Sequence, residues 1–249
     1  MIKIKSSEEF AMIKKSGEVL AKIMQELKNK ARVGLTTGEL DALAEDLVNK
    51  EGALPAFKGY QGYPATLCAS VNEEVVHGLP GRRVLKDGDL LSLDLGIDYK
   101  GYFSDCALTI PIGKIEGRRK KLLEVAKRAL QLGIKKARPG NHLSDISNAI
   151  QSCVEAEGFS VVRQFVGHGV GLAIHEEPEI PNFGLPHKGP LLKAGMVLAI
   201  EPMVNMGTWE VEVLSDGWTA VTKDRMPSVH FEHTVGITEN GPEIFTKYG

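Results

Sequence analysis

Cysteine is scarce in this sequence, and its few positions do not pair. The chain has three cysteines, Cys68, Cys106 and Cys153, an odd number with wide spacing. A disulfide framework needs cysteine pairs and a thiolate zinc site needs closely spaced ones, so neither is expected. The composition therefore favours a reduced, soluble and cytoplasmic protein.

Long apolar runs and an excess of one charge are also missing. The first residues, MIKIKSSEEF, carry charges where a signal peptide has its apolar stretch, and no run reaches the roughly 18 residues of a membrane span. The net charge is -2, from 30 basic and 32 acidic residues, so neither nucleic acid nor a membrane is expected as a partner. A solvated helix face is the interpretation given to the basic side chains near the start, Lys3, Lys5, Lys14 and Lys15.

Several catalytic motifs are absent as well. There is no HExxH, the helix motif of thermolysin-type zinc peptidases. There is no Walker loop and no serine in a nucleophile elbow. GHGVGL is similar to a dinucleotide fingerprint but has Leu172 in place of the third glycine. None of these chemistries is expected.

What the sequence does contain is a helical plan that recurs after about a hundred residues. Capping-box spacing predicts helices over 6–34 and 36–52, and apolar periodicity predicts a second pair over 117–138 and 140–158. The matched positions are Gly34 with Gly140, Leu40 with Ile146, Val48 with Val154, and Asp94 with Glu201.

A chain of 249 residues with 43% hydrophobic residues has enough apolar material for a substantial core. We therefore expect a single catalytic domain over 1–249, a pseudo-twofold α+β unit with repeats of roughly 6–113 and 117–249.

Acidic residues interrupt otherwise apolar predicted strands. Asp94 lies in LLSLDLGI, Glu201 in VLAIEPMV and Glu232 in HFEHTVGI, while Asp105 follows a predicted hairpin turn at 98–101. A buried carboxylate must be paired, protonated or bound to metal. Each one alone fits a local salt bridge at a strand edge. Together, without matched basic residues in these strands, they predict a site for two divalent cations.

Histidines flanked by glycine or acidic residues are further candidates for this site. His168 in VGHGVG is either a metal ligand or a surface residue of a tight turn. Oxygen-rich ligation with one imidazole favours Mn, Fe or Co over a thiolate-type zinc site. His77 and His175 could donate to a substrate carbonyl or shuttle protons. No role is given to the histidines in loop-like or exposed sequence, His142, His187 and His230, and His233 is expected to face away from Glu232.

Five segments resemble the motifs of type I methionine aminopeptidases, in the order of that family. They are LSLDLG, FSDCALT, FVGHGVGLAIHEEP, GMVLAIEPMV and HFEHTVGIT, and the similarity extends to TTGELD and GYPATLCASVNEEVVHGLPG. It covers nearly the whole chain and is closest to the short bacterial form of peptidase family M24. The resemblance implies a duplicated pita-bread fold, with a central antiparallel sheet, helices on its outer face and a metal site in the central cleft.

The resemblance also implies how the metals are held. Asp94 would chelate one ion, Asp105 and Glu232 would bridge both, and His168 and Glu201 would complete the second. The ions would be Co, Mn or Fe, with Zn as an alternative. The implied reaction removes the N-terminal methionine from peptides and nascent proteins when a small residue follows.

Catalytic roles follow from the same resemblance. A metal-bound hydroxide would be the nucleophile, and Glu201 would be the general base that passes its proton to the leaving amine. His77 and His175 would contact the substrate and stabilise the developing oxyanion.

The remaining site residues are implied by resemblance and have plain structural alternatives. The methionine-pocket candidates are Tyr60, Tyr63, Cys68, Ile174 and Trp218. Core or rim packing is their structural alternative, and for Cys68 and Ile174 the two interpretations are close. Phe57 stands where some relatives have cysteine, so the pocket outline is expected to differ. Asn72, Glu74 and Ser228 are candidates for a monovalent cation. A monomer that acts on nascent chains, with the ribosome as one place of encounter, is expected.

Three rival functions remain at this stage. A proline-specific peptidase of the same fold commonly carries a large N-terminal domain, whereas the first predicted helix here begins at about Ser6. A binding protein that had lost catalysis would be expected to lack some of the ligands. A carboxylate-rich metal store would leave His77 and His175 unexplained. Methionine release from Met-Ala-Ser, compared with cleavage of Ala-Pro-Ala, separates the first rival.

Overall fold

A computed structural model describes residues 2–248, with four helices on one side of a layer of strands. The helices are α1 (Ser7–Lys30), α2 (Thr37–Lys50), α3 (Gly117–Lys136) and α4 (Leu143–Glu155), and a 3-10 turn, η1, spans Tyr60–Gly62. The strands are β1 (Leu54–Pro55), β2 (Cys68–Val71), β3 (Glu74–Val76), β4 (Leu90–Tyr99), β5 (Tyr102–Pro111), β6 (Ser160–Val161), β7 (Gly167–Gly169), β8 (Glu176–Ile180), β9 (Val197–Ile200), β10 (Met203–Asn205), β11 (Val211–Val213), β12 (Ala220–Thr222), β13 (Ser228–His230), β14 (His233–Thr238) and β15 (Gly241–Ile244).

The first two helices begin where their capping signals predict. The Ser6 hydroxyl accepts from the backbone N–H of Glu9 at 3.2 Å, and the Glu9 carboxylate accepts from the N–H of Ser6 at 2.7 Å. Thr36 and Glu39 form the same reciprocal pair at the start of α2. The prediction that α3 continues to Arg138 is wrong: it ends at Lys136, because proline at the next position disfavours helical backbone at Arg138.

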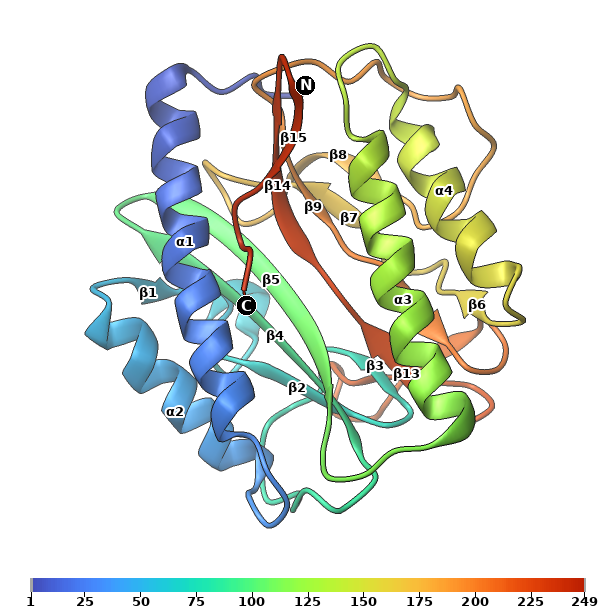
Figure 1. The fold of residues 1–249 in the computed structure, drawn as a ribbon. Helices are drawn as coiled ribbons and strands as arrows, with labels where there is room; N and C mark the ends of the chain where they lie inside the picture. Colours follow the sequence, from blue (N-terminus) through green and yellow to red (C-terminus); the bar gives the residue numbers. More distant parts are fainter. Residues whose placement is uncertain (1, 249) are drawn as a thin grey trace.

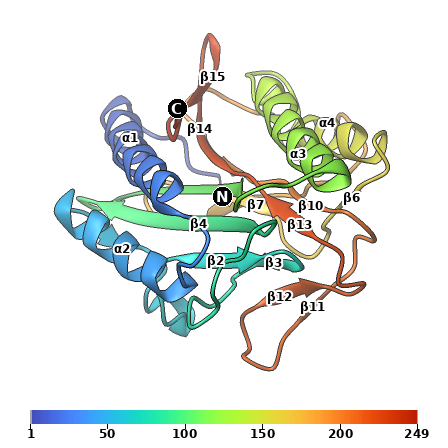
Figure 2. The same cartoon turned by 60° about the horizontal axis from the view of Figure 1, so that its bottom comes forward.

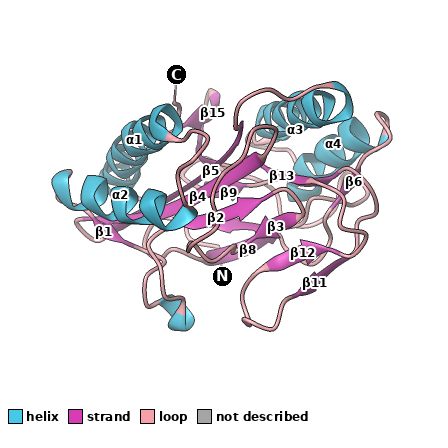
Figure 3. Cartoon of the chain, turned by 90° about the horizontal axis from the view of Figure 1, so that it is seen from below, coloured by secondary structure: helices cyan, strands magenta, loops and turns pink. Residues whose placement is uncertain are grey.

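The helices lie in two pairs on the same face of the strand layer. α1 and α2 cover one half, and α3 and α4 cover the other, with the long β4–β5 hairpin between them (Figure 1). From below, all four helices lie above the strands, and β11 and β12 project from the opposite side (Figure 3). The largest apolar cluster fills the space between helices and strands. The opposite face of the strands is therefore free to carry polar groups.

The two halves repeat the same local geometry. An isolated bridge joins Thr36 to Val84, and its counterpart joins His142 to Leu191, each at the start of the second helix of its pair. Matched glycines share positive φ: Gly34 and Gly140 at 90° and 87°, Gly52 and Gly158 at 70° and 75°, and Gly88 and Gly195 at 90° and 88°. Only glycine adopts these values readily, which explains the glycines of the repeat. The boundary between the repeats near 113–117 stays a prediction.

Antiparallel pairing carries the acidic positions to one place. β4 and β5 form the predicted hairpin, with Lys100 and Gly101 in its turn at φ 58° and 85°, the left-handed values that a tight hairpin turn needs. This register sets Asp105 opposite Gly96. A second sheet has the order β15-β14-β9-β7-β8, and in it His168 on β7 lies opposite Ala199 on β9.

Figure 2 shows how the halves meet: β4 and β2 approach β13, β10 and β7 beneath the helices. The backbone N–H of Glu232 donates to the carbonyl of Ala107 on β5 at 2.8 Å. Asp105 is tied across the same junction, because its N–H donates to the Thr234 hydroxyl at 2.9 Å. Carboxylates that are far apart in sequence therefore meet at the centre of the molecule.

Candidate active site

The five predicted metal ligands come together at the junction of the two halves. Their ligand atoms fall into overlapping groups in which all atoms lie within 4.8 Å of one another. One group joins Asp94, Asp105 and Glu232, and another joins His168, Glu201 and Glu232. A third contains Asp105, His168 and His175. Asp105, Glu232 and His168 each belong to two groups and so lie centrally in the cluster.

The strands explain why these side chains converge. Asp94 lies within β4 and Asp105 within its hairpin partner β5. His168 is the middle residue of β7, Glu201 follows the last residue of β9, and Glu232 precedes β14. Because β14, β9 and β7 are neighbours, the last three are brought to one edge.

Burial dominates the electrostatics of the cluster. Asp105 and Glu232 are 3% and 2% exposed. Burial, followed by repulsion from Asp105, raises the pKa of Glu201 and of Asp94 well above the usual range. Burial also raises the pKa of Asp105 to about 7 and raises that of Glu232. These carboxylates resist simultaneous ionisation unless positive charge is supplied.

The donor atoms fit divalent cations. Oδ1 of Asp94 and Oε1 of Glu232 are buried with no hydrogen-bond partner among the described residues. No lysine or arginine lines the surrounding cavity within residues 2–248. Burial, followed by the neighbouring His175, lowers the pKa of His168 to about 3, so its imidazole is neutral at pH 7 and able to ligate. Four carboxylates and a neutral imidazole match the ligand preferences of Mn and similar ions.

Two further histidines border the cluster. His77 follows β3 in a left-handed conformation, with φ 59°, and its ring packs edge-on against Phe165 at 5.4 Å between centroids. His175 precedes β8, and its ring lies 4.4 Å from that of His168 and 5.1 Å from that of Tyr60. Burial lowers the pKa of both, to about 4 for His77, so each is neutral at pH 7.

A cavity of about 340 Å³ adjoins the cluster and contains the predicted methionine-pocket residues. The predicted pocket side chains that line it are Tyr60, Tyr63, Cys68 and Trp218. Ile174 is buried in the same apolar cluster as Tyr63 and Cys68. Phe57 also lines the cavity, and it packs over Gly96, where an added Cβ would lie 2.7 Å from its ring. The cavity is therefore an apolar pocket with the carboxylates at its end.

A second cavity, of about 530 Å³, leaves the cluster in another direction. It shares lining residues with the first, namely His77, Asp94, His168, His175 and Glu201. Its own walls include Gln164, Phe165, Glu177 and Glu179. Sequence reasoning gave Phe165 no role, although it stands within the FVGHGVG motif, three residues before His168.

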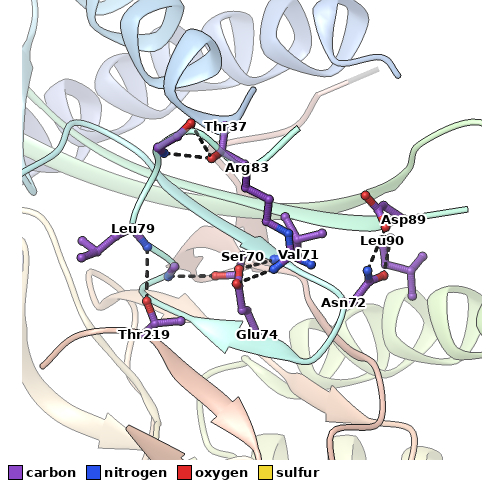
Figure 4. Close-up of polar contacts among 12 residues, drawn as sticks. Thr37, Ser70, Val71, Asn72, Glu74, Leu79, Arg83, Asp89, Leu90 and Thr219 are labelled. Carbon is purple, nitrogen blue, oxygen red and sulfur yellow. Dashed lines mark hydrogen bonds and ion pairs between the residues drawn. The ribbon is translucent and has the colours of Figure 1, made fainter. Parts of the chain in front are cut away.

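The residues predicted for a monovalent cation lie at the start of β3 and of β13 and just before β3, and their side chains bond within the protein; the Ser228 hydroxyl, for example, donates to the Val204 carbonyl at 3.3 Å. The Glu74 carboxylate accepts from the N–H of Val71 and pairs with Arg83 (Figure 4). The Asn72 amide donates to Asp89 at 2.8 Å, and the N–H of Ser228 donates to the Asn72 carbonyl at 2.8 Å. The cation at this place stays a prediction.

Two residues interpreted as exposed are buried. Lys5 is not part of a solvated helix face: it precedes α1, is 6% exposed and pairs with Glu176. His230 is not exposed: it belongs to β13, is 2% exposed, and its Nε2 lies 3.5 Å from Oε2 of Glu201. Pairing of β13 with β10 buries it. His233 instead contacts the Thr246 hydroxyl through Nδ1 at 3.0 Å.

The chain is similar to known metallopeptidases over almost its whole length. Residues 11–239 match the model of metallopeptidase family M24. The chain is 53% identical over 246 residues to a methionine aminopeptidase of Clostridium perfringens, covering 99% of both sequences. A methionine aminopeptidase structure from Thermotoga maritima superposes with a TM-score of 0.97 and 48% identity, covering 99% of this chain and 100% of that one.

A more distant structure bears on the proline-specific alternative. The prolidase of Pyrococcus furiosus superposes with a TM-score of 0.81 and 28% identity, and the match covers 99% of this chain but 66% of the prolidase. The lower identity and the partial coverage both make the chain less similar to that prolidase than to the methionine aminopeptidases.

No helix within residues 2–248 has the length and apolarity needed to cross a membrane.

Proposed function

Because the chain belongs to metallopeptidase family M24 and, within it, to the methionine aminopeptidases, we propose that its buried carboxylate cluster holds two divalent ions and serves the removal of N-terminal methionine. The observation that carries the proposal is the pair of buried, unpartnered oxygens on Asp94 and Glu232 within a cluster of four carboxylates. An oxygen-rich set with one imidazole favours Mn, Fe or Co, with Zn as an alternative.

The overlapping groups support a division of the ligands between two ions. Asp94, Asp105 and Glu232 would hold one ion, and His168, Glu201 and Glu232 would hold the other, with Asp105 as the second shared ligand that the family resemblance implies. When bound, the ions supply charge neutralisation for the carboxylates, an acidified water and polarisation of the scissile carbonyl.

Glu201 is the general base. Its Oε1 lies 3.4 Å from Nε2 of His168 and its Oε2 lies 3.5 Å from Nε2 of His230, so the carboxylate is bracketed by two imidazoles. Without metal, burial and repulsion from Asp105 raise the pKa of Glu201, so bound cations would be needed to keep the carboxylate ionised and able to accept a proton. It takes the proton of the attacking water and delivers it to the leaving amine.

His77 and His175 orient the substrate carbonyl. Both are neutral at pH 7, so each offers one ring N–H as a donor. Donors aimed at a developing oxyanion in a site shielded from water stabilise the transition state more than the ground state. We assign both histidines this role.

The two cavities give the substrate a direction. The methionine side chain occupies the apolar pocket lined by Tyr63, Cys68 and Trp218, where a flexible thioether fits aromatic and sulfur-containing walls. The following residues leave through the second cavity. Phe165 packs against His77 where the cavities meet and narrows the space for the second side chain, which favours a small residue there.

The natural substrates are nascent proteins and peptides, met in the cytoplasm and at the ribosome by a monomeric enzyme. The cysteines at 68, 106 and 153 are all free, in keeping with a reducing compartment.

The decisive experiment strips the protein with chelator, restores Mn, Co or Fe singly, and measures release of the first residue from Met-Ala-Ser and Ala-Pro-Ala. Methionine release that depends on added metal is expected. Glu201→Gln should abolish it, whereas Glu212→Gln, an exposed glutamate on β11 paired with Arg225, should not. Full turnover by Glu201→Gln would refute the assigned base, and preferential cleavage of Ala-Pro-Ala would refute the substrate.

A further inference from the structure

The chain's first segment carries a buried charge to the edge of the active site. Nζ of Lys5 lies 2.5 Å from Oε2 of Glu176, and the two side chains are 2% and 5% exposed. The stem of Lys5 packs beside the loop that follows β7, since a Cβ added at Gly171 would lie 3.0 Å from its Cε. An ion pair so deeply buried gives little net stability, because desolvation offsets most of its Coulomb attraction. Its placement therefore calls for another explanation.

Glu176 uses its second oxygen to close the loop. Oε1 accepts from the backbone N–H of Leu172 at 2.6 Å and from that of Ala173 at 3.1 Å. These residues connect β7, which carries His168, to His175. A single carboxylate thus closes the turn from Leu172 to Glu176, which contains His175.

The backbone of Lys5 is anchored independently. Its N–H donates to the carbonyl of Gly195 at 2.8 Å, and the N–H of Gly195 donates to the carbonyl of Ile237 on β14. Nζ therefore reaches Glu176 from a point attached to the central sheet.

His175 depends on this support. Its ring contacts His168 and Tyr60, and within residues 2–248 the ring itself makes no hydrogen bond. The direction of its N–H is consequently set by the backbone between Leu172 and Glu176. A donor that must meet a developing oxyanion loses effect when it is displaced by a fraction of an ångström.

We propose that Lys5 is a positioning residue for catalysis: through its buried ion pair with Glu176 it fixes the loop that aims His175 at the substrate carbonyl. The inference rests on the proposed role of His175. Without the lysine, the Glu176 carboxylate is left buried with uncompensated charge and turns toward water, which releases Leu172 and Ala173.

The test measures kcat and KM for Met-Ala-Ser with the metal-loaded full chain. Lys5→Met retains the stem and removes the charge, and Glu176→Gln removes the charge of the partner. Each should lower kcat by about ten- to a hundredfold. KM should change by less than about threefold, as expected for an interaction made in the transition state. Lys5→Arg should restore part of kcat. The control is Lys14→Met, which breaks the half-exposed pair with Glu243, away from the cluster.

A combination with His175→Ala separates positioning from general stability. If Lys5 acts through His175, Lys5→Met should cause no further loss of kcat in the His175→Ala background, and Mn titration should give unchanged stoichiometry. Multiplying losses, or wild-type kcat in folded Lys5→Met, would overturn the inference. If Lys5→Met does not fold, Glu176→Gln decides by the same criteria. Full turnover by His175→Ala would instead refute the role of His175, and the inference with it.

Discussion

Replacing Gly78 with alanine should separate the substrate-contacting loop from the sheet that supports it. Gly78 directly follows His77 and is hydrogen-bonded to β2. Its N–H donates to the Ser70 hydroxyl at 3.1 Å, and its carbonyl accepts from the N–H of Ala69 at 2.9 Å. Ser70 and the neighbouring contact of Leu79 with Thr219 are visible in Figure 4. The loop thus lies directly against the strand.

An added methyl group has no room at this position. A Cβ at Gly78 would lie 2.8 Å from the Ala69 carbonyl oxygen and 2.8 Å from the Ser70 Cα, both backbone atoms that cannot rotate away. Ordinary contact begins at 3.4 Å, so the loop and β2 must separate by roughly 0.6 Å. Overpacking of this kind costs about 1–3 kcal/mol of unfolding free energy. Because His77 is adjacent, we expect kcat to fall by about ten- to a hundredfold.

Gly81 provides a matched control in the same loop. A Cβ there meets nothing within 4 Å, so Gly81→Ala makes the same chemical change without the clash. Urea unfolding and Met-Ala-Ser kinetics should show Gly78→Ala impaired in both measurements and Gly81→Ala near wild type. Equal behaviour of the two variants would refute the steric reasoning.

Three other predictions concern charge in the site. Without metal at pH 8, Glu201→Gln should raise the Tm, because burial raises the pKa of Glu201 and makes its ionised form unfavourable in the folded protein. Each kcal/mol of unfolding free energy gained in this way should raise the Tm by about 2–4 °C, and a lower Tm in calorimetry would contradict the prediction. Mn at a hundred times its Kd should stabilise the wild type by about 2.7 kcal/mol in urea titrations, and Asp94→Asn should lose most of that gain. Burial lowers the pKa of folded His77 to about 4, below its unfolded value of 6.5, so its contribution is present above pH 6.5 and lost as pH falls toward 4. Asparagine tolerates the left-handed backbone at this position, so His77→Asn is a suitable test. Between pH 7 and 4 the variant should lose less unfolding free energy than wild type, and the two losses should differ by at most about 3 kcal/mol; parallel pH profiles would exclude this.

The sequence by itself determined the features that depend on neighbours along the chain. The capping boxes at Ser6 and Thr36 form as predicted, because each needs only the next three residues. The hairpin turn at Lys100 and Gly101 is equally local. The acidic residues of the apolar strands were recognisable because a buried carboxylate requires compensation wherever it lies. Asp105 is such a residue, and it lies in the cluster.

Only the tertiary structure decided which distant groups meet. Lys5 has the sequence pattern of an exposed lysine, yet its partner Glu176 lies 171 positions away. His230 gave no local signal, and it is buried beside Glu201 because β13 pairs with β10. Neither contact has a sequence signature, since both depend on how β7, β9, β13 and the first segment pack together. Local patterns specify which side chains require partners, and long-range packing selects those partners.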